Sequence, residues 1–213
     1  MKQRQYNLDK TAYDLEKENK RFIWKFFTYL YFLLFSLRNF KEIYIMCGII
    51  GFTGNLQAPG ILVDGLQQLE YRGYDSAGIA VNNGSETKIV KTTGKVATLR
   101  EKVEAAADLA GTCGIGHTRW ATHGGVTEVN AHPHVSGNVT LIHNGIIENY
   151  KELAASLKTK GFTAISETDT EVAAMLIDSL YDGDPFAALK EADKALDGAY
   201  GFCVMFKDHP GEI

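Results

Sequence analysis

Residues 46–213 of this 213-residue chain predict one layered domain of mixed helices and strands, either α/β or α+β. The segment is rich in Gly, Ala, Val, Ile and Thr, as compact domains of mixed class are. Its predicted strands lie at both ends and its helices mainly in the middle, unlike the regular strand–helix alternation of a parallel sheet. No GxGxxG or P-loop sequence is present, so nothing in the chain indicates a nucleotide cofactor.

The elements of this domain are assigned from the period of their apolar residues. A short apolar run or strict alternation predicts a strand, and recurrence every three to four residues predicts a helix. The predicted strands cover 47–52, 77–81, 88–92, 112–117, 139–144 and 200–206. The predicted helices cover 59–69, 96–109, 148–160, 168–181 and 184–196. Thr168 and Asp184 begin the last two helices, where their side-chain oxygens would cap free backbone N–H groups.

The first 45 residues differ in composition from the rest of the chain. They hold nine Lys and Arg against five Asp and Glu, a charge of about +4, which leaves about −8 for residues 46–213. They contain 12 of the 23 aromatic residues and none of the 21 glycines. We therefore expect an N-terminal extension over 1–45 and one domain over 46–213.

An apolar run at 22–37 is the main feature of this extension. Its 16 residues would span about 24 Å as a helix, short of the ~30 Å hydrocarbon core of a membrane. Three interpretations are open: a short membrane anchor, a removable propeptide, or a coding start placed too early, with translation beginning at Met46. The Lys-, Phe- and Ile-rich composition without Gly or Pro favours the last, so we do not expect a membrane protein.

Charge and cysteine content exclude several classes. A net charge of −4 argues against a nucleic-acid-binding protein, which is normally basic. Cys47, Cys113 and Cys203 are widely spaced and form no CxxC pair, which argues against a zinc ribbon or a disulfide framework and fits a reducing cytoplasmic compartment. Cys113 and Cys203 lie in apolar runs and are expected to be buried. His132 and His134 have no matching Cys or carboxylate ligands, so we predict no metal site.

Four polar clusters lie at the ends of predicted strands and helices. They are 117–124 (HTRWATHG), 130–134 (NAHPH), 143–145 (HNG) and 166–171 (SETDTE). Loops at such ends commonly assemble a binding cleft. The residues alone leave the reaction open, because Arg119 could pair with a surface carboxylate and Asp169 could only stabilise a helix N-terminus. A Ser–His–Asp hydrolase is not indicated, since the GxSxG sequence is missing.

Taken together with two further runs, these clusters resemble a known family. The run 46–51 (MCGIIG) resembles the start of the N-terminal-nucleophile, or type 2, glutamine amidotransferases. The run 70–78 (EYRGYDSAG) and the four clusters resemble the glutamine–fructose-6-phosphate aminotransferases (isomerising) within that group. The resemblance covers 46–213 and implies an α+β fold, built as a four-layer αββα sandwich of the N-terminal-nucleophile hydrolase type. It implies an enzyme, and the residues themselves indicate neither a cofactor nor a metal.

The resemblance also implies a role for individual residues. Cys47 would be the nucleophile and the first residue of the mature chain, with its α-amino group, of pKa near ~8, as the base. The side-chain amide of Asn144 and the backbone N–H of Gly145 would form the oxyanion hole. The implied substrate-binding residues are Arg119 for the α-carboxylate, Asp169 for the α-ammonium group, Trp120, Thr122 and His123 in a loop that closes over the substrate, and Arg72 near the nucleophile.

The implied reaction is the hydrolysis of L-glutamine to glutamate and ammonia through a Cys47 thioester. In the family, further C-terminal domains use this ammonia to convert fructose 6-phosphate to glucosamine 6-phosphate, the first step of hexosamine synthesis. We expect this chain to be a fragment, truncated at its C-terminus, that reaches fructose 6-phosphate only through those missing domains. The full-length protein is expected to be a cytoplasmic homodimer.

Two other functions stay open. The chain could be the glutaminase domain of another type 2 amidotransferase, such as the purine-pathway enzyme. It could also be a glutamine-binding module without activity, because the nitrogen of Cys47 is an amide whenever residues 1–46 are attached, and an amide is not a base.

Overall fold

A computed structural model describes residues 47–213 of the chain. The expectations about residues 1–45, including the apolar run at 22–37, lie outside the described residues. Within residues 47–213, no helix is long and apolar enough to cross a membrane.

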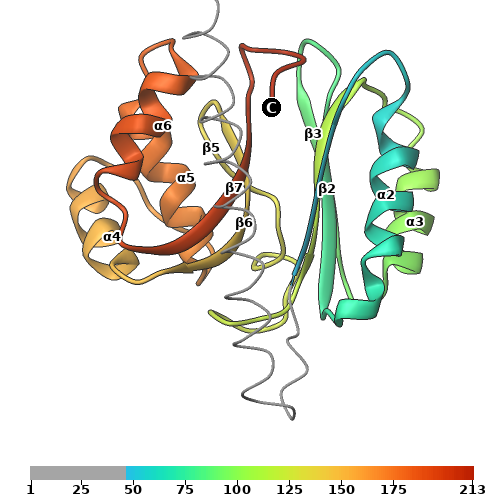
Figure 1. The fold of residues 1–213 in the computed structure, drawn as a ribbon, viewed down its shortest axis with the longest axis horizontal. Helices are drawn as coiled ribbons and strands as arrows, with labels where there is room; N and C mark the ends of the chain where they lie inside the picture. The colour runs from blue at the N-terminus through green and yellow to red at the C-terminus, as the bar shows by residue number, and fades with distance from the viewer. Residues whose placement is uncertain (1–46) are drawn as a thin grey trace, which may run out of the picture. The chain divides into compact units, whose positions relative to one another are not determined.

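The strands of this part form two antiparallel sheets (Figure 1). The first sheet has the order β1-β4-β2-β3, and the second has the order β5-β6-β7. The strands are β1 (Gly48–Thr53), β2 (Ser76–Asn82), β3 (Thr87–Thr93), β4 (Cys113–Arg119), β5 (His134–Ser136), β6 (Val139–Ile147) and β7 (Gly198–Phe206). The helices are α2 (Ala58–Gln68), a 3-10 turn η1 (Glu70–Arg72), α3 (Val96–Ala105), α4 (Tyr150–Thr159), α5 (Asp169–Leu180) and α6 (Pro185–Asp193).

Three buried clusters join these elements into four layers. The first cluster packs α2 and α3 against the first sheet, and the second packs α4, α5 and α6 against the second sheet. The third lies between the two sheets and contains Ala80, Cys113, Ile115, Ile142 and Met205. The order helices, sheet, sheet, helices is visible in Figure 1. The α+β class and the four-layer αββα sandwich are therefore confirmed.

Strand β2 is buried on both faces, and its side chains alternate between two of the apolar clusters. Ile79 and Val81 belong to the cluster under α2 and α3, whereas Ala80 points to the other face and meets the second sheet. Successive side chains of a strand point to opposite faces, so a strand between two layers carries apolar residues on both faces. Each fully buried Ile or Val contributes about 1.5–3 kcal/mol.

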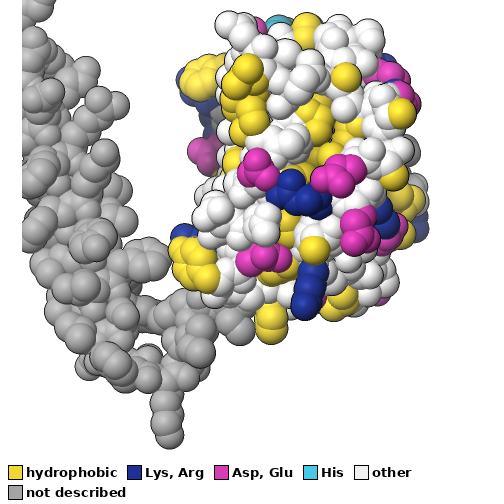
Figure 2. All heavy atoms as spheres, turned by 90° about the vertical axis from the view of Figure 1, so that its right-hand side faces the viewer, with side chains coloured by type: hydrophobic (Ala, Val, Ile, Leu, Met, Phe, Trp, Pro, Cys, Tyr) yellow, Lys and Arg dark blue, Asp and Glu magenta, His cyan; other side chains and the backbone are white. Residues whose placement is uncertain are grey.

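Figure 2 shows the outer face of the layer formed by α2 and α3. Acidic and basic side chains are interspersed on it with scattered hydrophobic ones. The ion pair between Arg100 and Asp64 (2.7 Å) joins the two helices. Such exposed pairs add little to stability, so the buried face fixes these helices on the sheet.

Both predicted helix caps are confirmed. The Thr168 hydroxyl accepts a hydrogen bond from the Glu171 N–H (3.2 Å), and the Asp184 carboxylate accepts from the Phe186 and Ala187 N–H groups (2.9 and 3.1 Å). A cap that satisfies otherwise free N–H groups is worth about 1 kcal/mol.

Other element boundaries differ from the predictions. Helix α3 ends at Ala105 and not at residue 109, and the short β5 and η1 were not predicted because three residues show no period. More important, β4 continues to Arg119 and β6 continues to Ile147. Their antiparallel partners keep pairing up to Gly48 and Gly198, so residues expected in loops extend the strands.

Gly78 of β2 allows a backbone segment to approach the first sheet closely. A Cβ atom at this position would lie 2.2 Å from the His132 carbonyl oxygen and 3.0 Å from the Val90 carbonyl oxygen. Both neighbours are backbone atoms, which cannot move away as a flexible side chain would. Residue 78 therefore has to be glycine for His132 to reach the interior.

We predict that Gly78→Ala destabilises the fold by about 1–3 kcal/mol, the usual cost of forcing extra atoms into a packed site. Gly60→Ala is the matched control, since nothing lies within 4 Å of a Cβ atom there. The control should leave stability unchanged or raise it slightly, because alanine is the better helix former. Urea denaturation measures both, and equal effects would contradict the packing.

Candidate active site

A cavity of about 260 Å³ opens where the ends of β4 and β6 meet the start of α5. Eight residues that the sequence predicted for the site line it: Cys47, Arg119, Trp120, Thr122, His123, Asn144, Gly145 and Asp169. The cavity is smaller than the ~300–1,000 Å³ typical of drug-sized ligands, so a small metabolite fits its size. The structure thus brings together residues that lie more than a hundred positions apart in the chain.

Arg72 is the predicted site residue that is not part of the cavity lining. It ends the 3-10 turn η1, and its Nε donates a hydrogen bond to the Tyr71 hydroxyl (3.2 Å). Its guanidinium also stacks over the Tyr71 ring, 5.7 Å from the ring centroid. Arg72 therefore contacts its own turn and not the cavity.

Cys47 lies directly before β1, at the wall of the cavity. Its Sγ accepts a hydrogen bond from the Trp120 backbone N–H (3.1 Å), and its carbonyl oxygen accepts one from Asn144 Nδ2 (3.0 Å). Burial raises the pKa of the Cys47 thiol, an effect that the Trp120 N–H opposes and the Asp75 carboxylate reinforces. The thiol is therefore protonated near neutral pH, and a nucleophilic role requires a base.

Gly145 follows Asn144 in β6, and its backbone conformation requires glycine. Its φ is +124°, and a Cβ atom would lie 2.0 Å from the Ala199 carbonyl oxygen of β7. A side chain at this position would be excluded by both effects. The strand can therefore keep pairing with β7 while its end forms part of the cavity wall.

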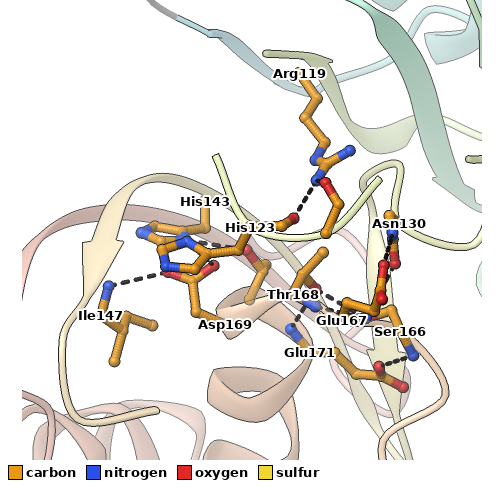
Figure 3. A network of polar contacts seen from close by, with 12 residues as sticks. Arg119, His123, Asn130, His143, Ile147, Ser166, Glu167, Thr168, Asp169 and Glu171 are labelled. Atoms are coloured by element: carbon orange, nitrogen blue, oxygen red, sulfur yellow. Dashed lines mark hydrogen bonds and ion pairs between the residues drawn. The ribbon is translucent and has the colours of Figure 1, made fainter. Parts of the chain in front are cut away.

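Arg119 is the last residue of β4 and is only 4% exposed. Its guanidinium donates to the carbonyl oxygen of His123 (Figure 3) and to that of Gly125, the latter at 3.2 Å. Among residues 47–213, no carboxylate oxygen forms an ion pair with it. A buried guanidinium that is held only by carbonyl groups remains available to an anionic ligand in the cavity.

Asp169 is the first residue of α5 and is also 4% exposed. Its Oδ2 accepts the Ile147 backbone N–H (3.0 Å), and its Oδ1 lies 3.9 Å from His123 Nδ1. Figure 3 shows the imidazoles of His123 and His143 beside this carboxylate. The helix N-terminus stabilises the negative charge, and the carboxylate also lines the cavity.

Two residues without a predicted role hold the loop that follows β4. Asn130 Nδ2 donates to the Gly125 carbonyl and to Glu167 Oε2, both at 3.0 Å, while its Oδ1 accepts the Glu167 N–H at 3.0 Å. Glu167 Oε2 also accepts the Gly125 N–H at 3.1 Å (Figure 3). Both residues belong to motifs that the sequence singled out, but their contact joins positions 37 apart.

Four histidines are buried in this region: His117, His132 and His143 line the cavity, and His134 lies outside its lining. Burial lowers the pKa of each, that of His117 to about 4. The rings of His117 and His132 are 4.1 Å apart, so a charge on one would also disfavour a charge on the other. All four imidazoles are therefore neutral at pH 7.

Comparison with known proteins gives the class. A family model described as a glutamine amidotransferase domain matches residues 117–211. Two solved structures share the fold with TM-scores of 0.65 and 0.66: glutamine phosphoribosylpyrophosphate amidotransferase from B. subtilis, at 30% identity, and an allosteric regulatory enzyme of purine biosynthesis, at 31%. Each alignment covers 75% of this chain and 35% of the solved chain. The chain therefore contains a glutamine amidotransferase domain.

Curated relatives with higher identity narrow this class. The chain is 54% identical over 166 residues to glutamine–fructose-6-phosphate aminotransferase (isomerizing) from Thermus thermophilus and 52% identical over 172 residues to the enzyme from Idiomarina loihiensis. These matches cover 77% and 79% of this chain but only 27% and 28% of the relatives. The chain therefore spans about a quarter of the length of these relatives.

The neutral histidines predict how stability depends on pH. An unfolded histidine binds a proton near pH 6.5, whereas folded His117 binds one near pH 4. Between these values the unfolded state holds more protons, so the free energy of unfolding should fall as the pH falls through this window. His132→Gln should reduce the slope by up to about 1.4 kcal/mol per pH unit. Urea denaturation at several pH values measures it, and an unchanged slope in the variant would contradict the burial of a neutral His132.

Proposed function

We propose that this chain hydrolyses L-glutamine to glutamate and ammonia, with Cys47 as the nucleophile. The observation that carries the proposal is the composition of the cavity wall, which combines a thiol, an amide donor, a guanidinium and a carboxylate. Arg119 and Asp169 complement the α-carboxylate and the α-ammonium group of a free amino acid. The thiol of Cys47 and the amide of Asn144 suit the carboxamide at the other end of glutamine.

In the proposed reaction, Cys47 Sγ attacks the carboxamide carbon and its proton passes to the α-amino nitrogen of Cys47. The amide of Asn144 and the N–H of Gly145 stabilise the negative oxygen of the tetrahedral intermediate. The proton is then delivered to the leaving nitrogen, the C–N bond breaks, and ammonia departs. Water attacks the resulting thioester, which releases glutamate and restores the thiol.

We infer that the functional chain begins at Cys47, after initiation at Met46 and removal of that methionine. The raised pKa of the Cys47 thiol supports this, because a protonated thiol needs a base at hand. A free α-amino group has a pKa near ~8 and can accept the proton. The amide nitrogen that links Cys47 to Met46 in the longer chain cannot.

The ammonia acceptor is proposed from the relatives. Their names, together with identities of 45–54%, support delivery of ammonia to fructose 6-phosphate. The homodimer is likewise proposed for a full-length protein, and this chain spans about a quarter of the length of those relatives. The phosphoribosylpyrophosphate amidotransferase of B. subtilis is the alternative type, and its 30% identity disfavours it. A cytoplasmic location suits a nucleophilic thiol that must stay reduced.

The recognition of the amino-acid head group tests this function. In protein that begins at Cys47, Arg119→Lys should raise the KM for glutamine about tenfold to a hundredfold, because an ammonium group cannot reproduce a bidentate pair. Asp169→Asn should act in the same direction. Coupled assays of glutamate and ammonia release measure both variants.

Arg100→Lys is the matched control, since Arg100 pairs with Asp64 on the outer face of α2 and α3. It should hydrolyse glutamine like the parent. The rate of Cys47 alkylation by iodoacetamide should stay near the parent value in all three variants, which separates head-group binding from thiol reactivity. A parent-like KM for either Arg119→Lys or Asp169→Asn would show that the assignment is wrong.

A further inference from the structure

The amide group of Asn144 is fixed at both of its ends. Its Nδ2 donates to the Cys47 carbonyl (3.0 Å), and its Oδ1 lies 2.9 Å from Nε2 of His117. A carbonyl oxygen can only accept, so the nitrogen of the amide must face Cys47. Oδ1 then faces the imidazole, and Nε2 of His117 must carry the proton. Each atom in this chain of contacts thus determines the role of the next.

His117 is held rigidly enough to determine the orientation of this amide. It lies in β4, paired with Ile49 of β1 on one side and with Gly78 of β2 on the other, and it is 1% exposed. Burial lowers its pKa to about 4, so the ring is neutral and carries a single N–H. Its Nδ1 has no hydrogen-bond partner among the described residues. A proton on Nδ1 would be a buried donor without an acceptor, so the single N–H lies on Nε2, which donates to Asn144 Oδ1.

The other buried histidines make different contacts. His134 Nε2 and His143 Nδ1 lie 3.1 and 3.0 Å from the hydroxyl groups of Thr168 and Thr170, at the start of α5. They tie the second sheet to its helix, which is a structural role. His117 instead contacts the side chain that the proposed mechanism places at the developing negative charge.

We propose that His117 is a positioning residue that holds the Asn144 amide with its nitrogen toward the nucleophile. The proposal rests on the proposed role of Asn144 as an oxyanion donor. The last torsion of an asparagine side chain has two broad, nearly equivalent orientations, so an amide without a fixed partner can exchange its oxygen and nitrogen positions. The exchanged orientation presents an acceptor to the negative oxygen and removes the stabilisation.

Of the two groups that contact the Asn144 amide, the Cys47 carbonyl is held less firmly than the His117 imidazole. In the proposed mature chain its carbonyl belongs to the first residue, and chain ends are less well ordered than central strands. His117 lies in β4, between two paired strands of the same sheet. The imidazole therefore supplies the fixed reference for the amide.

Two variants at residue 117 separate this role from simple packing. The terminal amide nitrogen of Gln can stand in for Nε2 of His, whereas the shorter Asn reaches only the position of Nδ1. We expect His117→Gln to keep kcat within about threefold of the parent. His117→Asn should lower kcat about tenfold to a hundredfold with an unchanged KM, less than the ~10²–10³ expected for loss of the donor itself. If His117→Asn does not fold, His117→Leu serves with the same expected loss.

A double-mutant cycle provides the decisive readout. In an Asn144→Ala background, His117→Asn should lower kcat no further, because no amide remains to be oriented. A purely structural role for His117 would instead give losses that multiply. The positioning role is overturned if His117→Asn keeps the parent kcat, or if its loss is the same in both backgrounds.

Each variant is made in the 213-residue chain and in protein translated from Met46, and the more active form is compared with its own parent. If neither parent releases ammonia from glutamine, the proposed function fails and this proposal fails with it. If Asn144→Ala lowers kcat but His117→Asn does not, the proposed function stands and only the positioning role is wrong.

Discussion

The register between β1 and β4 is the constraint on which the site depends. Gly48 pairs with Thr118, and its N–H donates to the Thr118 hydroxyl (2.9 Å), so the preceding Cys47 lies beside the end of β4. The same strand carries His117 and Arg119. A slip by one residue would exchange the two faces of β1 and remove the thiol from its neighbours. Strand pairing, and not a flexible loop, therefore determines where the nucleophile lies.

The charged groups of the cavity are also fixed in place by the fold. Its wall contains one guanidinium and one carboxylate, Arg119 and Asp169, each buried and each held mainly by backbone groups. His117 and His132, which also line the cavity, are neutral because they are buried. Donors and charges that are fixed in advance in a site of low dielectric need no reorganisation when a charge develops. This arrangement supports the proposal that the cavity binds glutamine.

The fold class and the helix caps could be predicted from the sequence, whereas the strand ends and the contacts within the site could not. Local signals were sufficient for the layered class and for the caps at Thr168 and Asp184, because these depend on the period and on single side chains. The continuation of β4 to Arg119 was missed, since it depends on pairing with distant strands. The contact of Asn130 with Glu167 and that of His117 with Asn144 join positions 37 and 27 apart, which no local pattern reveals. The motifs were sufficient to predict which residues lie near the site. Their contacts with one another depend on how the strands pair.

We propose that Cys47 acts as the nucleophile with its own α-amino group as the base. The most direct measurement compares glutamine hydrolysis by protein whose first residue is verified as Cys47 with that by protein verified to begin at Met1. We expect the longer chain to be slower by about a hundredfold or more, since loss of a general base costs about 10²–10⁴ in rate. Equal rates in the two verified proteins would contradict it.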